Sequence, residues 1–374
     1  MIRFNMEKLK PIEHKLKGLF YLALKGLLSN RADNNRGALD ASQMKRVIIF
    51  RPDRLGDMVI TLPLVDNLKQ FFPHLKISIL ASPKNIGLIK DDKRFDEIFL
   101  YSKNIWRSPG ELLKVRRAKF DCIIDTVFED SVTTLYLTHY CASGKPIVGM
   151  GKKKFSRYYD FNFDNSGGHI IDNTLKLLNA FGVDSSKAGG YAEPFLSESH
   201  LKTASQSLKT MSNTGIHSLK IGINLSSGAP SRIWPKEKWI ELIKQLLKNL
   251  PDAQIILITV PHERVFAENI KGLFPERVHL TPQNLDILGV SAVIKNLDLL
   301  VTPDTSLVHI ARAFNVPVAG LYTRFAKNFD LWHPYGMKEQ AIKAESEHNI
   351  FDISVGQVLE RMQLLVKAGE EVNR

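Results

Sequence analysis

Residues 47–63 read Val47-Ile-Ile-Phe-Arg-Pro-Asp-Arg-Leu-Gly-Asp-Met-Val-Ile-Thr-Leu-Pro63, and this stretch decides the fold class. A short apolar run over 47–51 predicts a strand, and the residues from Met58 to Phe72 have the apolar spacing of a helix, which Pro73 stops. Gly56 lies between the two, where it permits a tight turn. A strand that passes through such a turn into a helix is typical of a βαβ unit in a parallel sheet.

Short apolar runs alternate with helical stretches along most of the chain. Further strands are expected at residues 76–80, 98–100, 122–125 and 146–149, and a second series at 221–225, 254–260, 299–301 and 317–321. A less regular stretch between about residues 190 and 218 separates the two series. We therefore expect two doubly wound, Rossmann-like domains, with a ligand in the cleft between them at the carboxyl ends of the strands.

This pattern divides the chain into four parts. They are a basic extension at residues 1–45, a first Rossmann-like domain at 46–200, a second at 201–350 and a C-terminal helix at 351–374. Each domain is long enough to bury a core of its own.

The composition is that of a globular protein with a basic surface. Of the 374 residues, 44% are hydrophobic and 24% are charged, which excludes a disordered chain, a collagen and a small disulfide-rich protein. The net charge of +12 indicates an anionic partner, which could be nucleic acid, a phosphorylated substrate or an acidic membrane surface. The two cysteines, Cys122 and Cys141, are expected to be buried thiols in a reducing compartment.

The amino-terminal extension holds much of the basic excess. Residues 1–46 carry ten Lys and Arg and four Asp and Glu, and residues 12–28 place apolar side chains on one helical face. The longest apolar run, Leu19–Leu24, is far below the roughly 18 residues that a membrane-spanning helix needs. Two interpretations stay open. The amphipathic helix either lies on an anionic membrane or packs on the protein itself.

The first motif that could carry chemistry is Arg51-Pro-Asp-Arg-Leu-Gly-Asp57, directly after the first strand. Asp57 is expected at the start of a helix. There its carboxylate either caps the helix or faces the cleft as a general base. Spacing alone leaves both interpretations open.

The second motif, Asn224-Leu-Ser-Ser-Gly-Ala-Pro-Ser-Arg-Ile-Trp-Pro235, follows the first strand of the second domain. The hydroxyl groups and backbone amides around Gly228 can bind phosphate oxygens, and Arg232 can neutralise their charge. The alternative is an ordinary polar loop in which Trp234 packs against the following helix.

The third motif, Val301-Thr-Pro-Asp-Thr-Ser-Leu-Val-His309, lies at the end of a later strand. Asp304 can cap the helix that follows, and Thr305 and Ser306 add donors for a pyrophosphate. His309 falls about one turn later, either on the ligand side or in the core.

A basic stretch, Lys152-Lys-Lys154 with Arg157, follows the strand expected at 146–149. Such charge runs are mostly solvated loops, and this one could also contact an anionic acceptor. The sequence favours the solvated loop.

In this order and at this spacing, the three motifs resemble glycosyltransferase family 9, the lipopolysaccharide heptosyltransferases. The resemblance covers roughly residues 46–370 and includes Val316-Pro-Val-Ala-Gly-Leu-Tyr322 after the third motif. It implies an α/β, GT-B architecture, in which the first domain binds the acceptor and the second binds the nucleotide sugar. It also implies inverting, metal-independent transfer of heptose or a related sugar from an ADP-sugar to a lipopolysaccharide core or similar glycolipid. No cofactor besides the donor is implied.

The resemblance also implies roles for individual residues. Asp57 becomes the catalytic base. The donor-binding residues are Ser226, Ser227, Gly228, Arg232, Glu263, Asp304, Thr305, Ser306 and His309, and no metal ligand is expected. Apart from the resemblance, the basic residues Arg51, Arg54, Lys153 and Arg157 are candidates for acceptor binding. Better-known members carry Lys at the position of Arg232, so the charge is kept and the geometry differs.

The implied partners are a nucleotide sugar, a glycolipid and the inner leaflet of an anionic membrane, with the enzyme in the cytoplasm and no nucleic acid bound. Two alternatives stay open. One is a transferase that uses a different nucleotide sugar. The other is a non-catalytic protein on a degenerate GT-B fold that binds a membrane surface or nucleic acid.

Overall fold

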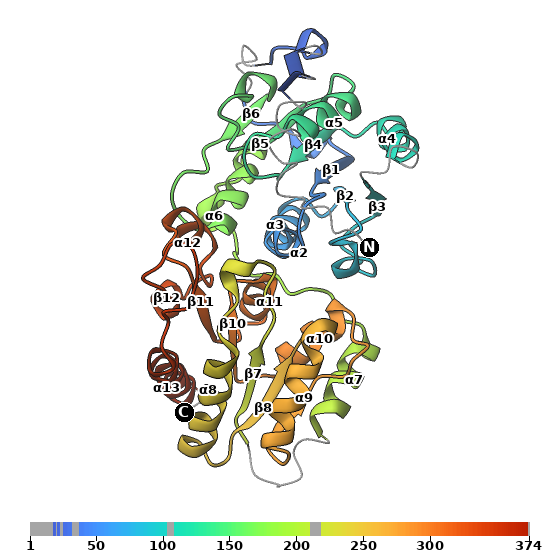
Figure 1. Ribbon diagram of the computed structural model, residues 1–374. Helices are drawn as coiled ribbons and strands as arrows, with labels where there is room; N and C mark the ends of the chain where they lie inside the picture. The colour runs from blue at the N-terminus through green and yellow to red at the C-terminus, as the bar shows by residue number, and fades with distance from the viewer. Residues whose placement is uncertain are drawn as a thin grey trace, which may run out of the picture.

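A computed structural model of the protein describes residues 18–19, 21–22, 25–31, 37–102, 108–209 and 218–372. Figure 1 shows two halves, one above the other, each built on its own sheet. The chain completes the first sheet before it begins the second. The two sheets lie within the expected ranges 46–200 and 201–350.

The first sheet has six parallel strands in the order β3-β2-β1-β4-β5-β6. Its strands are β1 (Arg46–Phe50), β2 (Lys76–Ala81), β3 (Glu97–Leu100), β4 (Cys122–Asp125), β5 (Ile147–Met150) and β6 (Phe161–Phe163). The helices of this half are α2 (Leu55–Val59), α3 (Leu62–Phe71), α4 (Ser108–Arg117), α5 (Val132–Ala142) and α6 (Ile170–Leu175). The strand order reverses between β1 and β4, and α/β proteins bind ligands at such a switch point.

The second sheet repeats this topology in the order β12-β11-β10-β7-β8-β9, again all parallel. Its strands are β7 (Lys220–Asn224), β8 (Gln254–Ile258), β9 (Val278–Leu280), β10 (Leu299–Pro303), β11 (Val318–Tyr322) and β12 (Ile342–Lys343). Its helices are α7 (Glu198–Lys209), α8 (Lys236–Asn249), α9 (Arg264–Leu273), α10 (Ile287–Lys295), α11 (Ser306–Ala313), α12 (Ala326–Trp332) and α13 (Val355–Val372). The predicted pair of doubly wound α/β domains is confirmed, and the second switch point lies between β7 and β10.

Two local predictions are corrected. The helix expected over 58–72 is two helices, α2 and α3. Pro63 has no N–H to donate to the carbonyl of Val59, so the helical hydrogen bonds are interrupted there. The strands β6 and β9 were not expected, because each is only three residues long. β6 lies at one edge of the first sheet and β9 at one edge of the second.

The domains meet where α2 packs against α11. A Cβ placed on Gly56 would lie 3.4 Å from Cδ2 of His309 and 3.6 Å from Cα of Ser306, so the two helices approach closely at this glycine. Gly56 does not adopt a positive φ, so close approach, and not the expected tight turn, is what favours glycine here. Apolar residues from both domains form one continuous cluster across this junction.

The expected helix over residues 12–28 lies partly outside the described residues. Where the chain is described, Tyr21 is buried, with its ring centroid 5.1 Å from that of Phe155. Leu19 and Leu22 are 64% and 58% exposed. The described part therefore contacts the protein on one side and leaves two leucines uncovered on the other.

Both cysteines are buried and free, as the sequence predicts. Burial raises the pKa of the Cys141 thiol to about 12, with Arg116 opposing the shift. The thiol therefore stays protonated at neutral pH and is chemically inert.

Candidate active site

Asp57 lies in the first turn of α2, directly after the strand end at which the first sheet reverses its order. Its Oδ2 accepts a hydrogen bond of 3.1 Å from the backbone N–H of Arg54. Arg54, not Asp57, is the N-cap residue, so the expected capping role is corrected: Asp57 supports the helix start from the third helical position. The carboxyl group is half-buried and retains capacity for further hydrogen bonds.

The second motif forms a turn at the carboxyl end of β7 that Asn224 organises. Its Nδ2 donates to the carbonyl of Ser226 at 3.1 Å and to the Thr302 hydroxyl at 2.9 Å, and its Oδ1 accepts from the Ser226 N–H at 3.1 Å. Asn224 has a structural role that its sequence pattern did not predict. The buried Asn224 amide links the ends of β7 and β10 across the switch point, so it fixes the loops that follow these two strands.

The serines of this turn are themselves held in place. The Ser226 hydroxyl accepts from the Val260 N–H at 2.9 Å, and the Ser227 hydroxyl donates to the Ala229 carbonyl at 2.7 Å. Gly228 is exposed, and nothing lies within 4 Å of where its Cβ would be. The turn is therefore ordered around an open position at Gly228.

Arg232 joins the second motif to the third. Its Nη1 donates to the backbone carbonyl of Asp304 at 2.9 Å, and its Nη2 lies 3.1 Å from Oδ2 of the same residue. The guanidinium is partly exposed, at 26% of its side chain, so it can also face a ligand in the cleft. This pair holds the loops after β7 and β10 together at the second switch point.

The structure corrects the expected cap of the third motif. Thr305 is the N-cap of α11, and its hydroxyl accepts from the Leu307 N–H at 3.3 Å. Asp304 is occupied by Arg232 and does not cap the helix. Ser306 opens α11, where the unpaired amides and the helix dipole favour an anion.

His309 lies in the domain junction, buried between α11 and α2. Burial lowers its pKa to about 4, with smaller contributions from His333 and Arg232, so the ring is neutral at pH 7. Its Nδ1 is buried and has no hydrogen-bond partner among the described residues. A donor-binding role for His309 stays a prediction, and a neutral ring would act in it by a hydrogen bond and not by charge.

Glu263 ends the short helix Pro261–Glu263 after β8, at the same sheet edge as the second motif. Its Oε1 lies 3.8 Å from Nε2 of the exposed His262. A contact with the donor ribose stays a prediction.

Residues 112–358 match the family model described as glycosyltransferase family 9 (heptosyltransferase), which is more than half of the chain. The chain belongs to glycosyltransferase family 9. The matched range contains the second and third motifs, whereas residues 47–63, with Asp57, lie outside it.

Two curated relatives of this family 9 glycosyltransferase are lipopolysaccharide heptosyltransferases. The core heptosyltransferase OpsX of Haemophilus influenzae is 24% identical over 293 residues, which cover 74% of this chain and 79% of the relative. Heptosyltransferase 1 of Campylobacter coli is 23% identical over 286 residues, which cover 73% and 82%. The predicted family and the predicted transferase class are therefore confirmed.

Solved structures agree on the fold. A family 9 glycosyl transferase from Veillonella parvula has a TM-score of 0.73 at 18% identity, over 88% of this chain and 99% of that chain. The Escherichia coli heptosyltransferase WaaC with ADP has a TM-score of 0.68 at 18% identity, over 87% and 99%. The GT-B architecture of the glycosyltransferase is confirmed.

The basic residues expected to bind the acceptor do not form one cluster. Arg54 is exposed beside Asp57, whereas Lys153 and Arg157 are exposed on the loop after β5. Arg51 is fully buried, and its role in acceptor binding stays a prediction. Arg51 follows β1 directly, and its guanidinium donates to the Thr61 hydroxyl and pairs with Asp53.

Lys152 also departs from the expected solvated loop. It is 1% exposed, and its Nζ lies 3.0 Å from Oδ2 of the fully buried Asp125 at the end of β4. Because a buried cation is stable only when paired, Lys152 is held by the neighbouring strand end and is not free to bind an acceptor.

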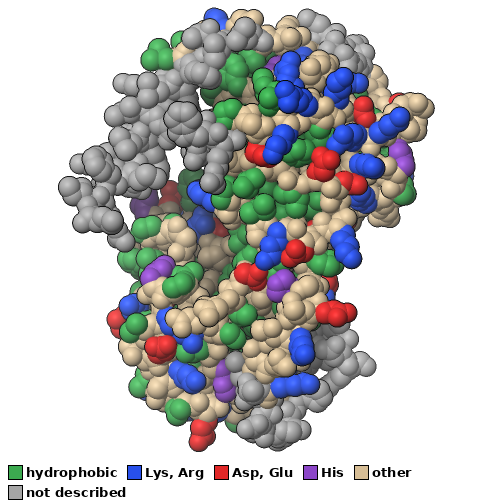
Figure 2. All heavy atoms as spheres, turned by 90° about the vertical axis from the view of Figure 1, so that its right-hand side faces the viewer, with side chains coloured by type: hydrophobic (Ala, Val, Ile, Leu, Met, Phe, Trp, Pro, Cys, Tyr) green, Lys and Arg blue, Asp and Glu red, His purple; other side chains and the backbone are tan. Residues whose placement is uncertain are grey.

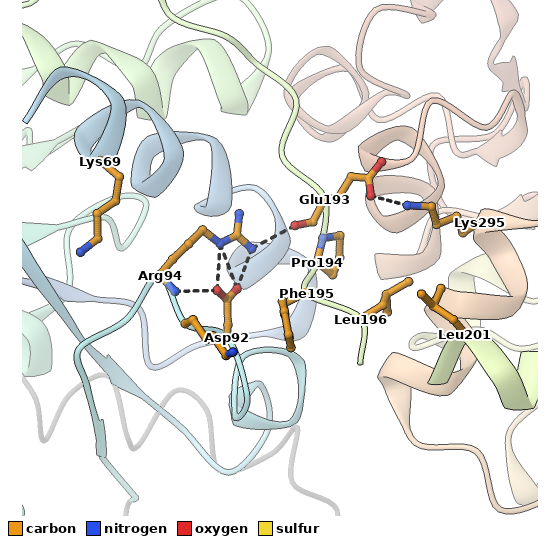
Figure 3. A pocket seen from close by; sticks show the side chains of 10 residues that line it. Lys69, Asp92, Arg94, Glu193, Pro194, Phe195, Leu196, Leu201 and Lys295 are labelled. Atoms are coloured by element: carbon orange, nitrogen blue, oxygen red, sulfur yellow. Dashed lines mark hydrogen bonds and ion pairs between the residues drawn. The ribbon is translucent and has the colours of Figure 1, made fainter. Parts of the chain in front are cut away.

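A cavity of about 620 Å³ lies away from all three motifs. Figure 3 shows Arg94 ion-paired with Asp92 on its first-domain side, and Glu193 with Lys295 on its second-domain side. Asp92 and Arg94 precede β3, at the amino edge of the first sheet. We place the active site of the glycosyltransferase at the motifs instead, because α/β proteins bind ligands at the carboxyl edge.

Proposed function

We propose that this family 9 glycosyltransferase moves heptose, or a related sugar, from an ADP-sugar to a lipopolysaccharide core or similar glycolipid, with inversion and without a metal ion. The observation that carries the proposal is the contact of α2 with α11 at Gly56. It brings the helix start that holds Asp57 to the helix start that can bind the donor diphosphate. The proposed base and the proposed anion site thus come from two domains and lie on the two helices that meet at this contact.

In this mechanism Asp57 accepts the proton of an acceptor hydroxyl while the hydroxyl oxygen attacks the anomeric carbon. The bond from that carbon to the diphosphate oxygen breaks on the opposite face, so the configuration inverts and ADP leaves with the electron pair. Arg232 and the first amides of α11 stabilise the charge that develops on the leaving diphosphate. These groups supply at the leaving oxygen the positive charge that a metal ion would otherwise bring.

The relatives support the donor and acceptor classes of the proposal. Solved structures of WaaC hold ADP and ADP-2-deoxy-2-fluoro heptose, and the curated relatives are named for lipopolysaccharide. The chain would act in the same synthesis. Arg232 keeps a cation at the diphosphate, as a donor of this type needs.

Calorimetric titration of the full chain with ADP, GDP and UDP tests the donor. We expect saturable binding of ADP and much weaker binding of the other two. Saturable binding of UDP or GDP without binding of ADP would overturn the ADP-sugar assignment while leaving the transferase class intact.

We also propose that the enzyme works in the cytoplasm on the inner leaflet of an anionic membrane. Figure 2 shows Lys and Arg side chains, with some acidic ones among them, on the visible face of the amino-terminal half. In the same half, the last turn of α4 carries Lys114, Arg116 and Arg117. The exposed Leu19 and Leu22 add apolar surface to this half. None of the helices in the described part of the chain is long and apolar enough to span a membrane.

Replacing Leu19 and Leu22 together by serine should weaken binding to anionic vesicles about tenfold or more, since a buried leucine contributes roughly 1.5–3 kcal/mol. Flotation with phosphatidylglycerol vesicles measures this, with Leu273→Ser, an equally exposed leucine on α9, as the matched control. Wild-type flotation of the double variant would contradict membrane docking through this segment. Deleting residues 1–40 is a less specific test, because it also removes the buried ion pair of 2.7 Å between Arg31 and Asp160.

A further inference from the structure

A network of polar groups adjoins Asp57; Arg51 and Thr61 in it are buried, and the side chain of Asp53 is 29% exposed. The guanidinium of Arg51, at the end of β1, donates from Nε to the Thr61 hydroxyl at 2.9 Å and from Nη1 to Oδ2 of Asp53 at 3.3 Å. Thr61 donates in turn to the backbone carbonyl of Asp57 at 2.8 Å. Arg51 and Thr61 are fully buried. Arg51 thus connects the Asp53 side chain to the helical turn that carries the proposed base.

A second connection between Asp53 and Asp57 runs through one peptide unit. The N–H of the Asp53–Arg54 peptide donates to Oδ2 of Asp57 at 3.1 Å, and its carbonyl accepts from the Ser82 hydroxyl at 3.3 Å. The orientation of the Asp57 carboxylate therefore depends on how this peptide is held. Both routes converge on Asp53.

Two atoms of the network lack partners. Nη2 of Arg51 and Oδ1 of Asp53 are buried and make no hydrogen bond with any described residue. An ion pair held at 3.3 Å with unpartnered atoms on both members is costly to maintain for stability alone. Such arrangements are characteristic of functional sites.

We propose that Asp53 is a positioning residue for the transfer: its carboxylate holds Arg51, and through Arg51, Thr61 and the 53–54 peptide it fixes the carboxylate of Asp57 toward the acceptor hydroxyl. This inference rests on the proposed base role of Asp57. Asp53 itself need not touch either substrate.

The network predicts a pH dependence. Burial raises the pKa of Asp53 to about 6. Arg51 opposes this shift, and the carboxylates of Asp57 and Asp125 add to it. Lys152 pairs with Asp125 from the next strand end, and His309 on α11, which contacts α2 at Gly56, is neutral. As the pH falls through about 6, Asp53 is protonated and its charge-assisted hydrogen bond to Arg51 weakens. The Asp57 carboxylate is then held less firmly, and kcat falls below pH 6.

The test is the pH profile of kcat for Asp53→Asn, which keeps the size of the side chain and an acceptor oxygen but removes the charge. We expect kcat at pH 8 to fall about ten- to a hundredfold, since a misplacement of about 1 Å can cost a hundredfold. Affinity for ADP should not change. The rise of kcat through pH 6 in the wild type should be absent, because the variant resembles the protonated enzyme at every pH.

A second variant, Thr61→Val, removes the hydroxyl between Arg51 and Asp57 without changing charge, so it should lower kcat and keep the rise through pH 6. Asp252→Asn, an exposed carboxylate before β8, is the matched control and should leave kcat unchanged. Thermal melting of each variant checks that the fold is intact.

Three outcomes separate this inference from the proposed function. Wild-type kcat in both Asp53→Asn and Thr61→Val, with Asp57→Asn inactive, would overturn the positioning role alone. A rise through pH 6 that persists in Asp53→Asn would also overturn it. Wild-type turnover in Asp57→Asn would overturn the base and, with it, this inference.

Discussion

Replacing Asp57 by asparagine is expected to lower kcat by a factor on the order of 10²–10⁴, the usual contribution of a general base. Asparagine keeps the shape of the side chain and an oxygen that accepts the Arg54 N–H, so the helix start and the fold should persist. ADP binds on the other domain in the proposed mechanism, so its affinity should be unchanged. Steady-state kinetics with ADP-heptose and calorimetry with ADP measure the two effects separately.

The control for this prediction is Asp66→Asn in α3, a carboxylate of the same domain that pairs with Arg94 at 2.7 Å, away from the cleft. It should retain turnover. Turnover within a few-fold of the wild type in Asp57→Asn would remove Asp57 from the mechanism, and the base would then have to be sought elsewhere in the cleft.

Replacing Arg232 by alanine is expected to weaken ADP binding by roughly 1.5–3 kcal/mol, as for loss of a charge-assisted hydrogen bond. The effect has two sources. The diphosphate loses a cation, and Asp304 loses its ion pair of 3.1 Å with Arg232, so its negative charge near the phosphates is no longer offset by that cation. Arg232→Lys should do less harm because the charge is kept.

Calorimetric titration with ADP measures this loss. Lys248→Ala is the matched control, because it removes one positive charge from an exposed position in the last turn of α8. Equal ADP affinity in Arg232→Ala and in the wild type would contradict a diphosphate site between the second and third motifs.

Much of the fold could be predicted because its central strands are continuous apolar runs. Val47 to Phe50 are fully buried, and a run of this kind is typical of a parallel strand covered on both faces. The edge strands β6 and β9 carry no such signal, since each has three residues and is in part exposed. β6 and β9 are strands because they form hydrogen bonds with β5 and β8, and such pairing cannot be read from the local sequence.

The site could be predicted as far as its residues follow strand ends. Asp57, Ser226 and Thr305 all lie where a βα turn was expected, and parallel topology then brings them to the carboxyl edges. Which side chain caps a helix could not be predicted. Asp304 was expected to cap α11, but it pairs with Arg232, a residue 72 positions earlier in the chain.

Burial of charge was the least predictable feature. Arg51 and Lys152 are indistinguishable in the sequence from the exposed Arg54 and Lys153 beside them. Lys152 is buried beside Asp125, a carboxylate at the end of the neighbouring strand β4, whereas Arg51 pairs with Asp53 of its own loop. The pairing of Lys152 depends on strand order, which sets what lies next to the charge.

The central claim is tested most directly by a transfer assay with the full chain, ADP-heptose and a lipid-linked inner-core acceptor, in which NMR reads the anomeric configuration of the product. The account predicts a heptosylated glycolipid of inverted configuration and one ADP released per transfer, with the reaction unaffected by a chelator. Retention of configuration, or transfer from a UDP- or GDP-sugar but not from ADP-heptose, would contradict it.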